Sequence, residues 1–117
     1  MFEVQIRIAN LEKPELPAEL SLVVDTGATL SWIPRQILEG LGIEPLSRLP
    51  FSPADGRDLQ RDIGGVLLNI DGRQALVPVA IGESGESALL GATALETLGM
   101  IVDPVEKKLI PCNLLAL

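Results

Sequence analysis

The sequence predicts a domain built mostly of short β-strands. Three features of its 117 residues support this fold class. Short apolar or alternating runs recur along the chain, turns rich in Gly, Pro and Asp separate them, and only two segments have the character of short helices. No low-complexity stretch or linker interrupts the chain, so we expect a single domain over residues 1–117.

The N-terminal part predicts two strands. Residues 2–8 alternate apolar and polar side chains, which is typical of a strand with one buried face. Two prolines in residues 11–17 indicate a loop. Residues 20–24 (LSLVV) predict a short strand that is buried on both faces and leads directly into Asp25-Thr26-Gly27-Ala28.

A helix and two hairpins are expected next. The helix opens at Ile33-Pro34 and ends by Gly42, because proline fits the first helical turn and glycine is common at helix ends. Residues 46–53 are expected to be extended or looped. Ala54-Asp55-Gly56-Arg57 and Asp71-Gly72 predict hairpin turns, since Asp-Gly favours the backbone angles of a tight turn.

The C-terminal part predicts short strands around one helix. A strand is expected over residues 74–81, with its proline at an edge or bulge, followed by a short buried segment at Ala88-Leu89-Leu90-Gly91. Residues 92–98 predict a helix that a glycine closes. Two short strands then flank a turn at residues 103–106.

The composition excludes several kinds of chemistry. The chain has no histidine and one cysteine, Cys112, so it has no intrachain disulfide, no His-activated nucleophile and no histidine-based zinc site. We expect Cys112 to be a small buried apolar residue, and we expect no metal and no cofactor. A net charge of -7 without a basic patch argues against nucleic acid and anionic membranes as partners.

We expect no targeting segment in this chain. Its first residues lack a basic region followed by a long apolar stretch, and no apolar run approaches the ~18 residues of a membrane span. We therefore expect a cytoplasmic protein that does not contact a membrane.

Four segments, in their order along the chain, resemble the retropepsin-like aspartic proteases. Leu22-Val23-Val24-Asp25-Thr26-Gly27-Ala28 has the pattern of their active-site motif, an apolar strand followed by D-T/S-G-A/S. Residues 54–57 lie where these proteases place the tip of a flap hairpin. Ala88-Leu89-Leu90-Gly91 resembles their second motif, and Ile101-Val102-Asp103-Pro104 resembles their closing hairpin. The resemblance covers most of residues 2–111.

Two departures distinguish this chain from the viral members of that family. Thr29 stands where viral enzymes commonly carry an acidic residue, and the expected flap tip lacks their Gly-Gly-rich sequence, although Gly64-Gly65 lies downstream. The chain is in these respects more similar to the single-domain cellular or prokaryotic type.

The resemblance implies a retropepsin-like acid protease fold, a closed β-barrel-like domain with a flap hairpin and one or two short helices. It implies that Asp25 is catalytic, that Thr26, Gly27 and Ala28 form the active-site loop, and that Thr26 reaches the partner subunit's backbone. Gly27 is expected to adopt a backbone conformation closed to other residues. Leu89 and Gly91 belong to the second motif, and Gly91 allows close packing beneath the loop. The expected flap residues are Ala54, Asp55, Gly56 and Arg57.

The predicted function is that of an aspartic endopeptidase acting as a homodimer on peptides or proteins. Peptide hydrolysis needs one group to activate water and another to protonate the scissile group, and the chain has a single DTG motif. A two-fold axis supplies the second Asp25, and two carboxylates about 3 Å apart would share a proton. One alternative is a catalytically silent module of the same fold that serves dimerisation or peptide binding. Another is a different small β-barrel enzyme in which DTG is coincidental.

Individual residues keep alternative interpretations. Asp25 is also compatible with an ordinary loop aspartate or a helix N-cap. Trp32 and Leu90 are candidates for a substrate pocket, but either could pack in the core, which suits Leu90 better. The apolar tail at residues 113–117 (NLLAL) is expected to pair near Phe2 at a dimer interface, or else to be a frayed or truncated end.

Overall fold

The computed structural model describes residues 2–53 and 56–113, which contain nine strands and two short helices. The predicted mostly-β fold class is confirmed. The elements in chain order are β1 (Glu3–Ala9), β2 (Ala18–Val24), β3 (Ser31–Pro34), α1 (Arg35–Gly40), β4 (Ser47–Phe51), β5 (Leu59–Ile70), β6 (Arg73–Gly82), β7 (Leu89–Leu90), α2 (Ala92–Leu98), β8 (Met100–Asp103) and β9 (Lys108–Pro111).

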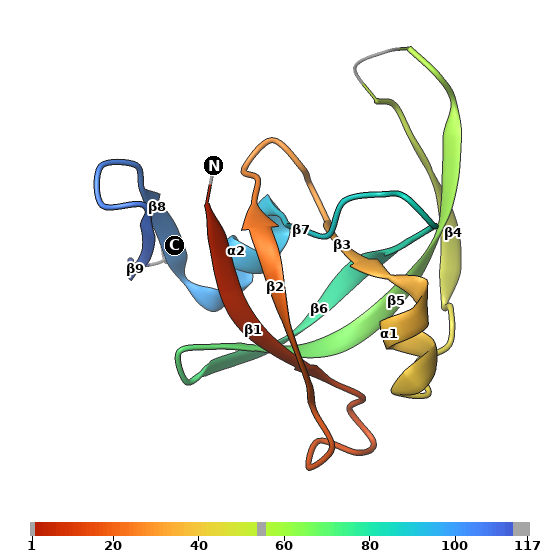
Figure 1. Ribbon diagram of the computed structural model, residues 1–117, viewed down its shortest axis with the longest axis horizontal. Helices are drawn as coiled ribbons and strands as arrows, with labels where there is room; N and C mark the ends of the chain where they lie inside the picture. The colour runs from red at the N-terminus through yellow and green to blue at the C-terminus, as the bar shows by residue number, and fades with distance from the viewer. Residues whose placement is uncertain (1, 54–55, 114–117) are drawn as a thin grey trace.

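Seven strands form one sheet, in the order β1-β2-β7-β3-β6-β5-β4. Residues 7–9 of β1 also pair with residues 67–69 of β5, so six of the seven strands close into a ring (Figure 1). β4 pairs with β5 outside this ring, and β8 and β9 form a separate hairpin. The closed arrangement agrees with the fold that the sequence motifs imply.

The β5–β6 turn has the predicted hairpin geometry. Asp71 and Gly72 have φ angles of 51° and 85°, and both positive values are those of a type I′ turn. In β6, Pro78 lies opposite Gly65, and β3 pairs with β6 only from Val79 onward. The proline therefore lies just outside the part of β6 that has a partner on both sides, as its missing N–H requires.

Both expected helices are present, with one shift. Pro34 is the residue before α1 rather than its first residue, and the chain leaves the helix at Gly42, whose φ is 73°. α2 spans the seven predicted residues, and Gly99 closes it in the left-handed conformation. Neither helix in the described part of the chain is long and apolar enough to cross a membrane.

The hydrophobic core fills the inside of the strand ring. Strands contribute alternate side chains to it, such as Leu22 and Val24 from β2, and α2 adds Leu95 and Leu98. Burying each such aliphatic side chain stabilises the fold by about 1.5–3 kcal/mol. The expectation that β2 is buried on both faces is wrong: Ser21 is exposed, because only the inner face of the strand meets the core.

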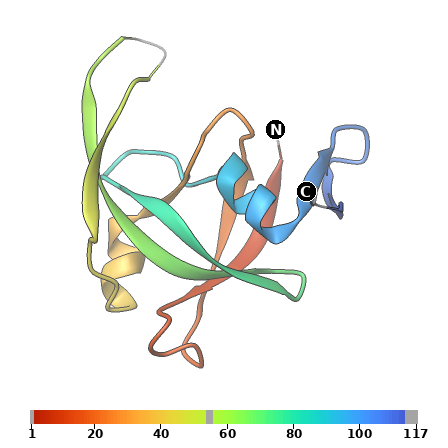
Figure 2. The same cartoon turned by 180° about the vertical axis from the view of Figure 1, so that it is seen from behind.

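Two hairpins extend from the ring. The β4–β5 hairpin rises on the same side as the loop that follows β2, as both ribbon views show (Figures 1 and 2). The β8–β9 hairpin follows α2, and the N–H of Cys112 donates a hydrogen bond to the carbonyl of Gly99 (2.9 Å). Cys112 is half-buried rather than buried, since it lies at the end of this peripheral hairpin. Residues 114–117, most of the predicted interface tail, lie outside the described residues.

Candidate active site

Asp25 lies on a tight turn directly after β2. Its N–H donates to the carbonyl of Leu90 (2.9 Å), and the N–H of Ala28 donates to the carbonyl of Asp25 (3.1 Å). Its carboxylate Oδ1 accepts the N–H of Gly27 (2.9 Å), a charge-assisted bond that fixes its direction. The residue before α1 is Pro34, which makes no side-chain cap, so Asp25 is not the N-cap of this helix.

The expected reason for glycine at position 27 is wrong, and the structure indicates another. Its φ is not among the positive values in the chain, so the backbone conformation itself is open to other residues. A Cβ at this position would lie 3.2 Å from Oδ1 of Asp25. A side chain would therefore crowd the carboxylate that the N–H of Gly27 holds.

Gly91 is the point of closest packing between the two motifs. β7 pairs in parallel with Val23 and Val24, which brings the residue after Leu90 beneath the active-site loop. A Cβ on Gly91 would lie 2.5 Å from the carbonyl oxygen of Leu30 and 2.8 Å from that of Ala28. Only glycine fits here, which agrees with its expected role.

Three hydrogen bonds join the loop to the start of α2. The N–H groups of Ala92 and Thr93 donate to the carbonyls of Ala28 (2.8 Å) and Thr29 (3.0 Å). The N–H of Gly91 donates to Oγ of Ser31 (3.0 Å), a side chain that is 1% exposed. Sequence reasoning missed Ser31, since a single serine beside an apolar run gives no sign that it will accept a buried N–H.

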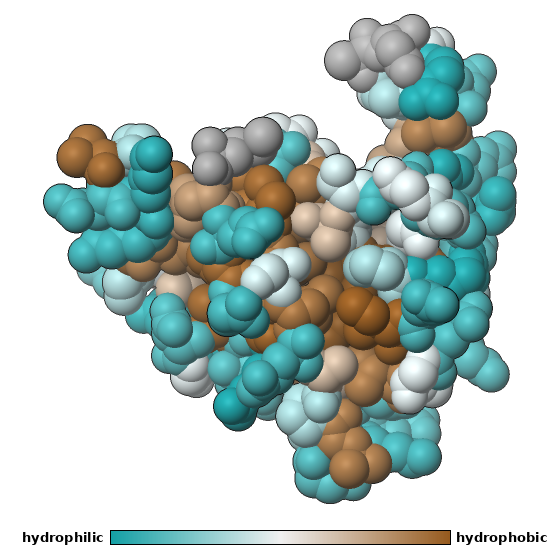
Figure 3. Space-filling model, viewed as in Figure 1, coloured by the Kyte–Doolittle hydropathy of each residue, from teal (hydrophilic) through white to brown (hydrophobic). Residues whose placement is uncertain are grey.

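An open groove of about 580 Å³ lies beside the loop and under the β4–β5 hairpin. Figure 3 shows this hairpin standing away from the body of the molecule. Trp32, half-buried on β3, lines the groove, and its contact with a substrate stays a prediction. The residues that line it are Gly27, Ala28, Thr29, Leu30, Trp32, Leu49, Pro50, Phe51, Ser52, Pro53 and Leu59.

Leu90 is placed in the core and not in the groove. Its side chain is fully buried, at 0% exposed, and it does not line the groove described above. The prediction that Leu90 lines a substrate pocket is therefore wrong. Successive residues of β7 point to opposite faces of the sheet, and Leu90 points to the inner face. Its contribution to the site is the carbonyl that Asp25 N–H contacts.

The β4–β5 hairpin carries the expected flap residues, and their role as a flap stays a prediction. Its strands pair from Ser47 opposite Ile63 to Phe51 opposite Leu59. Near its tip, Gly56 has a φ of 79° and donates its N–H to the carbonyl of Pro53 (3.0 Å). Gly56 and Arg57 are exposed. Ala54 and Asp55 lie outside the described residues, so the type of this turn stays a prediction.

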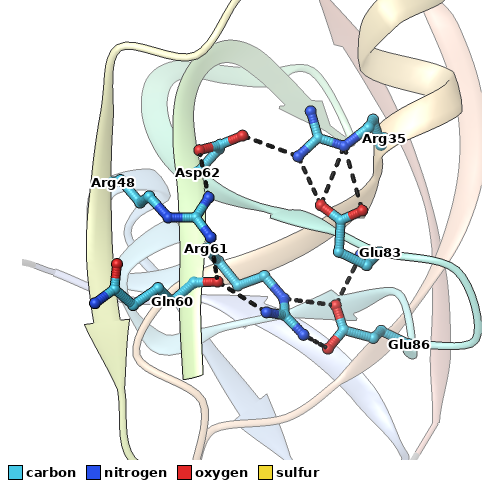
Figure 4. Close-up of polar contacts among 7 residues, drawn as sticks. All are labelled: Arg35, Arg48, Gln60, Arg61, Asp62, Glu83 and Glu86. Atoms are coloured by element: carbon cyan, nitrogen blue, oxygen red, sulfur yellow. Dashed lines mark hydrogen bonds and ion pairs between the residues drawn. The ribbon is translucent and has the colours of Figure 1, made fainter. Parts of the chain in front are cut away.

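Charged side chains connect the β4–β5 hairpin to the turn at residues 83–86 (Figure 4). Asp62 on β5 pairs with Arg35 and Arg48, both at 2.9 Å, and Arg35 also pairs with Glu83 at 2.6 Å. Hydrogen bonds from Arg35 and Arg48 lower the pKa of Asp62, and one from Arg35 lowers the pKa of Glu83. These carboxylates therefore stay ionised into acidic solution.

The structure is similar to solved proteases of retroviruses. The protease of Simian Foamy Virus (mac) superposes with a TM-score of 0.57, covering 80% of this chain and 91% of that chain at 19% identity. EIAV protease bound to an inhibitor gives a TM-score of 0.62, covering 84% and 88% at 17% identity. The fold is retropepsin-like. The sequence itself matches no family model and no curated protein.

The retropepsin-like fold brings the two sequence motifs together around one carboxylate. Asp25, the loop that follows it and Gly91 form one hydrogen-bonded unit beside the groove. Thr26 is exposed, and its side chain makes no hydrogen bond within residues 2–53 and 56–113. A single carboxylate can act as a base or as an acid, whereas peptide hydrolysis uses both.

Proposed function

We propose that this chain is one subunit of a homodimeric aspartic endopeptidase, a single domain whose Asp25 is the catalytic carboxylate. The observation that carries this proposal is the position of Asp25. Its carboxylate is held by the N–H of Gly27 at the end of a core strand, next to an open groove under a hairpin, in a retropepsin-like fold.

The second carboxylate comes from a second copy of the chain. A two-fold axis next to the loop brings Asp25 to its own copy, and the close pair shares one proton because both cannot readily ionise together. The ionised carboxylate takes a proton from the attacking water, and the protonated one polarises the carbonyl and then protonates the leaving nitrogen. We expect an acidic pH optimum from this shared proton.

The surroundings of Asp25 support a dimer at this place. The carbonyl of Phe2 accepts the N–H of Val24 (2.8 Å), so the start of the chain lies beside the catalytic strand. An interface that includes Phe2 and the apolar tail at residues 113–117 would then continue into the active-site loop. The exposed Thr26 is available to bond the backbone of the second copy.

The groove supports a peptide substrate. It is open and mainly apolar, with Leu30, Trp32 and Phe51 among its lining residues. The β4–β5 hairpin lies above it and would close over a bound peptide. Thr29 and the residues of the flap tip favour the cellular or prokaryotic type of this protease class over the viral type.

A peptide-library assay tests the proposal. Wild type, Asp25→Asn and a control, Asp71→Asn, are incubated with diverse peptides between pH 4 and 7, and their mass is followed by sedimentation. Asp71 is a turn residue at a positive φ that asparagine tolerates, so this control removes a carboxylate without touching the site. Cleavage by wild type and by Asp71→Asn, and none by Asp25→Asn, supports the peptidase. A stable wild-type dimer that cleaves nothing would favour the silent binding module.

A further inference from the structure

The most enclosed ion pair among those formed between described residues joins the flap base to the 83–86 turn. Arg61 on β5 makes two bonds to Glu86, from Nε to Oε1 (2.9 Å) and from Nη2 to Oε2 (2.6 Å). The two side chains are 17% and 24% exposed. Such a fork holds both partners in one orientation, which a single contact between flexible side chains does not.

The turn itself fixes the carboxylate of Glu86. Oε1 also accepts the N–H of Glu83 (2.7 Å), and the N–H of Glu86 donates to the carbonyl of Glu83 (3.1 Å). Gly85, inside the turn, has a φ of 86°, which glycine adopts without strain. These bonds within the turn hold the Glu86 carboxylate toward β5 independently of Arg61.

Arg61 in turn contacts the ring of Trp32, which lines the groove. Its guanidinium carbon lies 6.0 Å from the ring centre of Trp32, within the range of a cation–π contact. The ring of Trp32 meets the ring of Phe51 edge-on, with centres 5.1 Å apart and planes at 60°. A continuous path thus runs from the turn through Arg61 and Trp32 to the flap strand β4.

We propose that Arg61 and Glu86 are positioning residues that hold Trp32 against Phe51 and so fix the base of the flap over the groove. Neither residue lines the groove, so both act through Trp32. Where it concerns peptide binding, this inference rests on the proposed function. A groove held in its binding conformation favours peptide binding, because it loses less conformational freedom when the peptide binds.

The charges around Glu86 favour an ion pair between Arg61 and Glu86 that persists in acid. Arg61 and Arg57 act on it as cations, and Glu83 is the carboxylate beside it. The hydrogen bonds from Arg61 lower the pKa of Glu86, so its carboxylate remains paired in the mildly acidic range where a shared-proton dyad operates. Asp62, Arg35 and Arg48 form the adjoining pairs shown in Figure 4.

Trp32 is the only tryptophan and the chain has no tyrosine, so its fluorescence reports on the groove alone. Acrylamide quenching is compared for wild type, Glu86→Gln, Arg61→Lys and a control, Glu19→Gln. Glu19 also pairs with an arginine, Arg7 at 2.9 Å, but on the exposed face of β1 and β2. Circular dichroism establishes that each variant is folded. All four proteins carry Asp25→Asn, so no cleavage enters the measurement.

We expect stronger quenching and a red-shifted emission in Glu86→Gln, the same to a smaller degree in Arg61→Lys, and no change in Glu19→Gln. As the pH falls through the lowered pKa of Glu86, wild type should approach Glu86→Gln, because protonation removes the same partner. In the active enzyme, Glu86→Gln should raise KM roughly 3- to 10-fold with little change in kcat.

Unchanged quenching in folded Glu86→Gln overturns the positioning role, whatever the peptidase assay gives. A fall in kcat at constant KM overturns it as well. If Glu86→Gln alters quenching but the wild-type chain cleaves no peptide, the proposed function is contradicted. The positioning of Trp32 by Arg61 and Glu86 then still stands.

Discussion

The amide of Asp25 donates its hydrogen bond to the carbonyl of Leu90 across 2.9 Å. This bond ties the strand that carries the candidate catalytic carboxylate to the segment that places Gly91 under the loop. The direction of the carboxylate therefore depends on residues about 65 positions further along the chain, which the parallel pairing of β2 with β7 brings into register.

Gly91→Ala should destabilise the protein by about 2–3 kcal/mol, because the added Cβ would lie 2.5 Å from a backbone oxygen that cannot move without shifting the loop. Urea unfolding measures the change. The control is Gly40→Ala at the end of α1, where a Cβ meets nothing within 4 Å and should stabilise the helix by about 0.5–1 kcal/mol. Equal effects of the two substitutions would contradict the close packing at Gly91.

Ser31→Ala should lower the free energy of unfolding by about 1–3 kcal/mol, since it leaves the buried N–H of Gly91 without an acceptor. Ser21→Ala, on the exposed face of β2, is the matched control and should change stability far less. A Ser31→Ala protein as stable as wild type would show that the hydroxyl does not support the loop.

Stability should fall in acid partly through Glu86. The pKa of Glu86 is lowered in the folded protein, so its pairing with Arg61 stabilises the fold above about pH 4 and is lost as the pH falls through the folded pKa. Urea midpoints of wild type and Glu86→Gln should differ at pH 6 and converge as the pH falls through the lowered pKa of Glu86. A difference that stays constant with pH would assign the effect of the substitution to packing.

Deleting residues 113–117 should weaken the dimer, because the apolar tail is expected to pair at the interface near Phe2. Sedimentation across a concentration series measures the association. Higher salt should strengthen association of the undeleted chain, since each subunit carries a net charge of -7 and the two repel. A dimer that is equally strong without the tail would refute the interface assignment.

Local chemistry made much of the fold predictable. The hairpin at Asp71-Gly72 and the end of α2 at Gly99 each need a positive φ, and the residues that adopt it most readily stand there. The requirement for glycine at position 91 also follows from its motif. The retropepsin-like fold could be inferred because these short motifs occur in a specific order.

Contacts between distant residues could not be predicted. Arg61 and Glu86 are 25 residues apart, and the pairing of Trp32 with Phe51 depends on how the β4–β5 hairpin lies relative to β3, so neither pair has a local signature. The prediction that β2 is buried on both faces was wrong for a related reason. Ser21 lies within an apolar run, but the neighbours of a strand decide which of its faces meets the core.

The central claim is that one active site uses Asp25 from two copies of the chain, and a subunit-mixing assay tests it most directly. Wild type at fixed concentration is refolded together with an equal amount of Asp25→Asn, and peptide cleavage is measured. Random pairing leaves about half of the original number of fully wild-type dimers, so activity should fall to about half and decline further with more mutant. Activity that stays constant as Asp25→Asn is added would contradict the shared site.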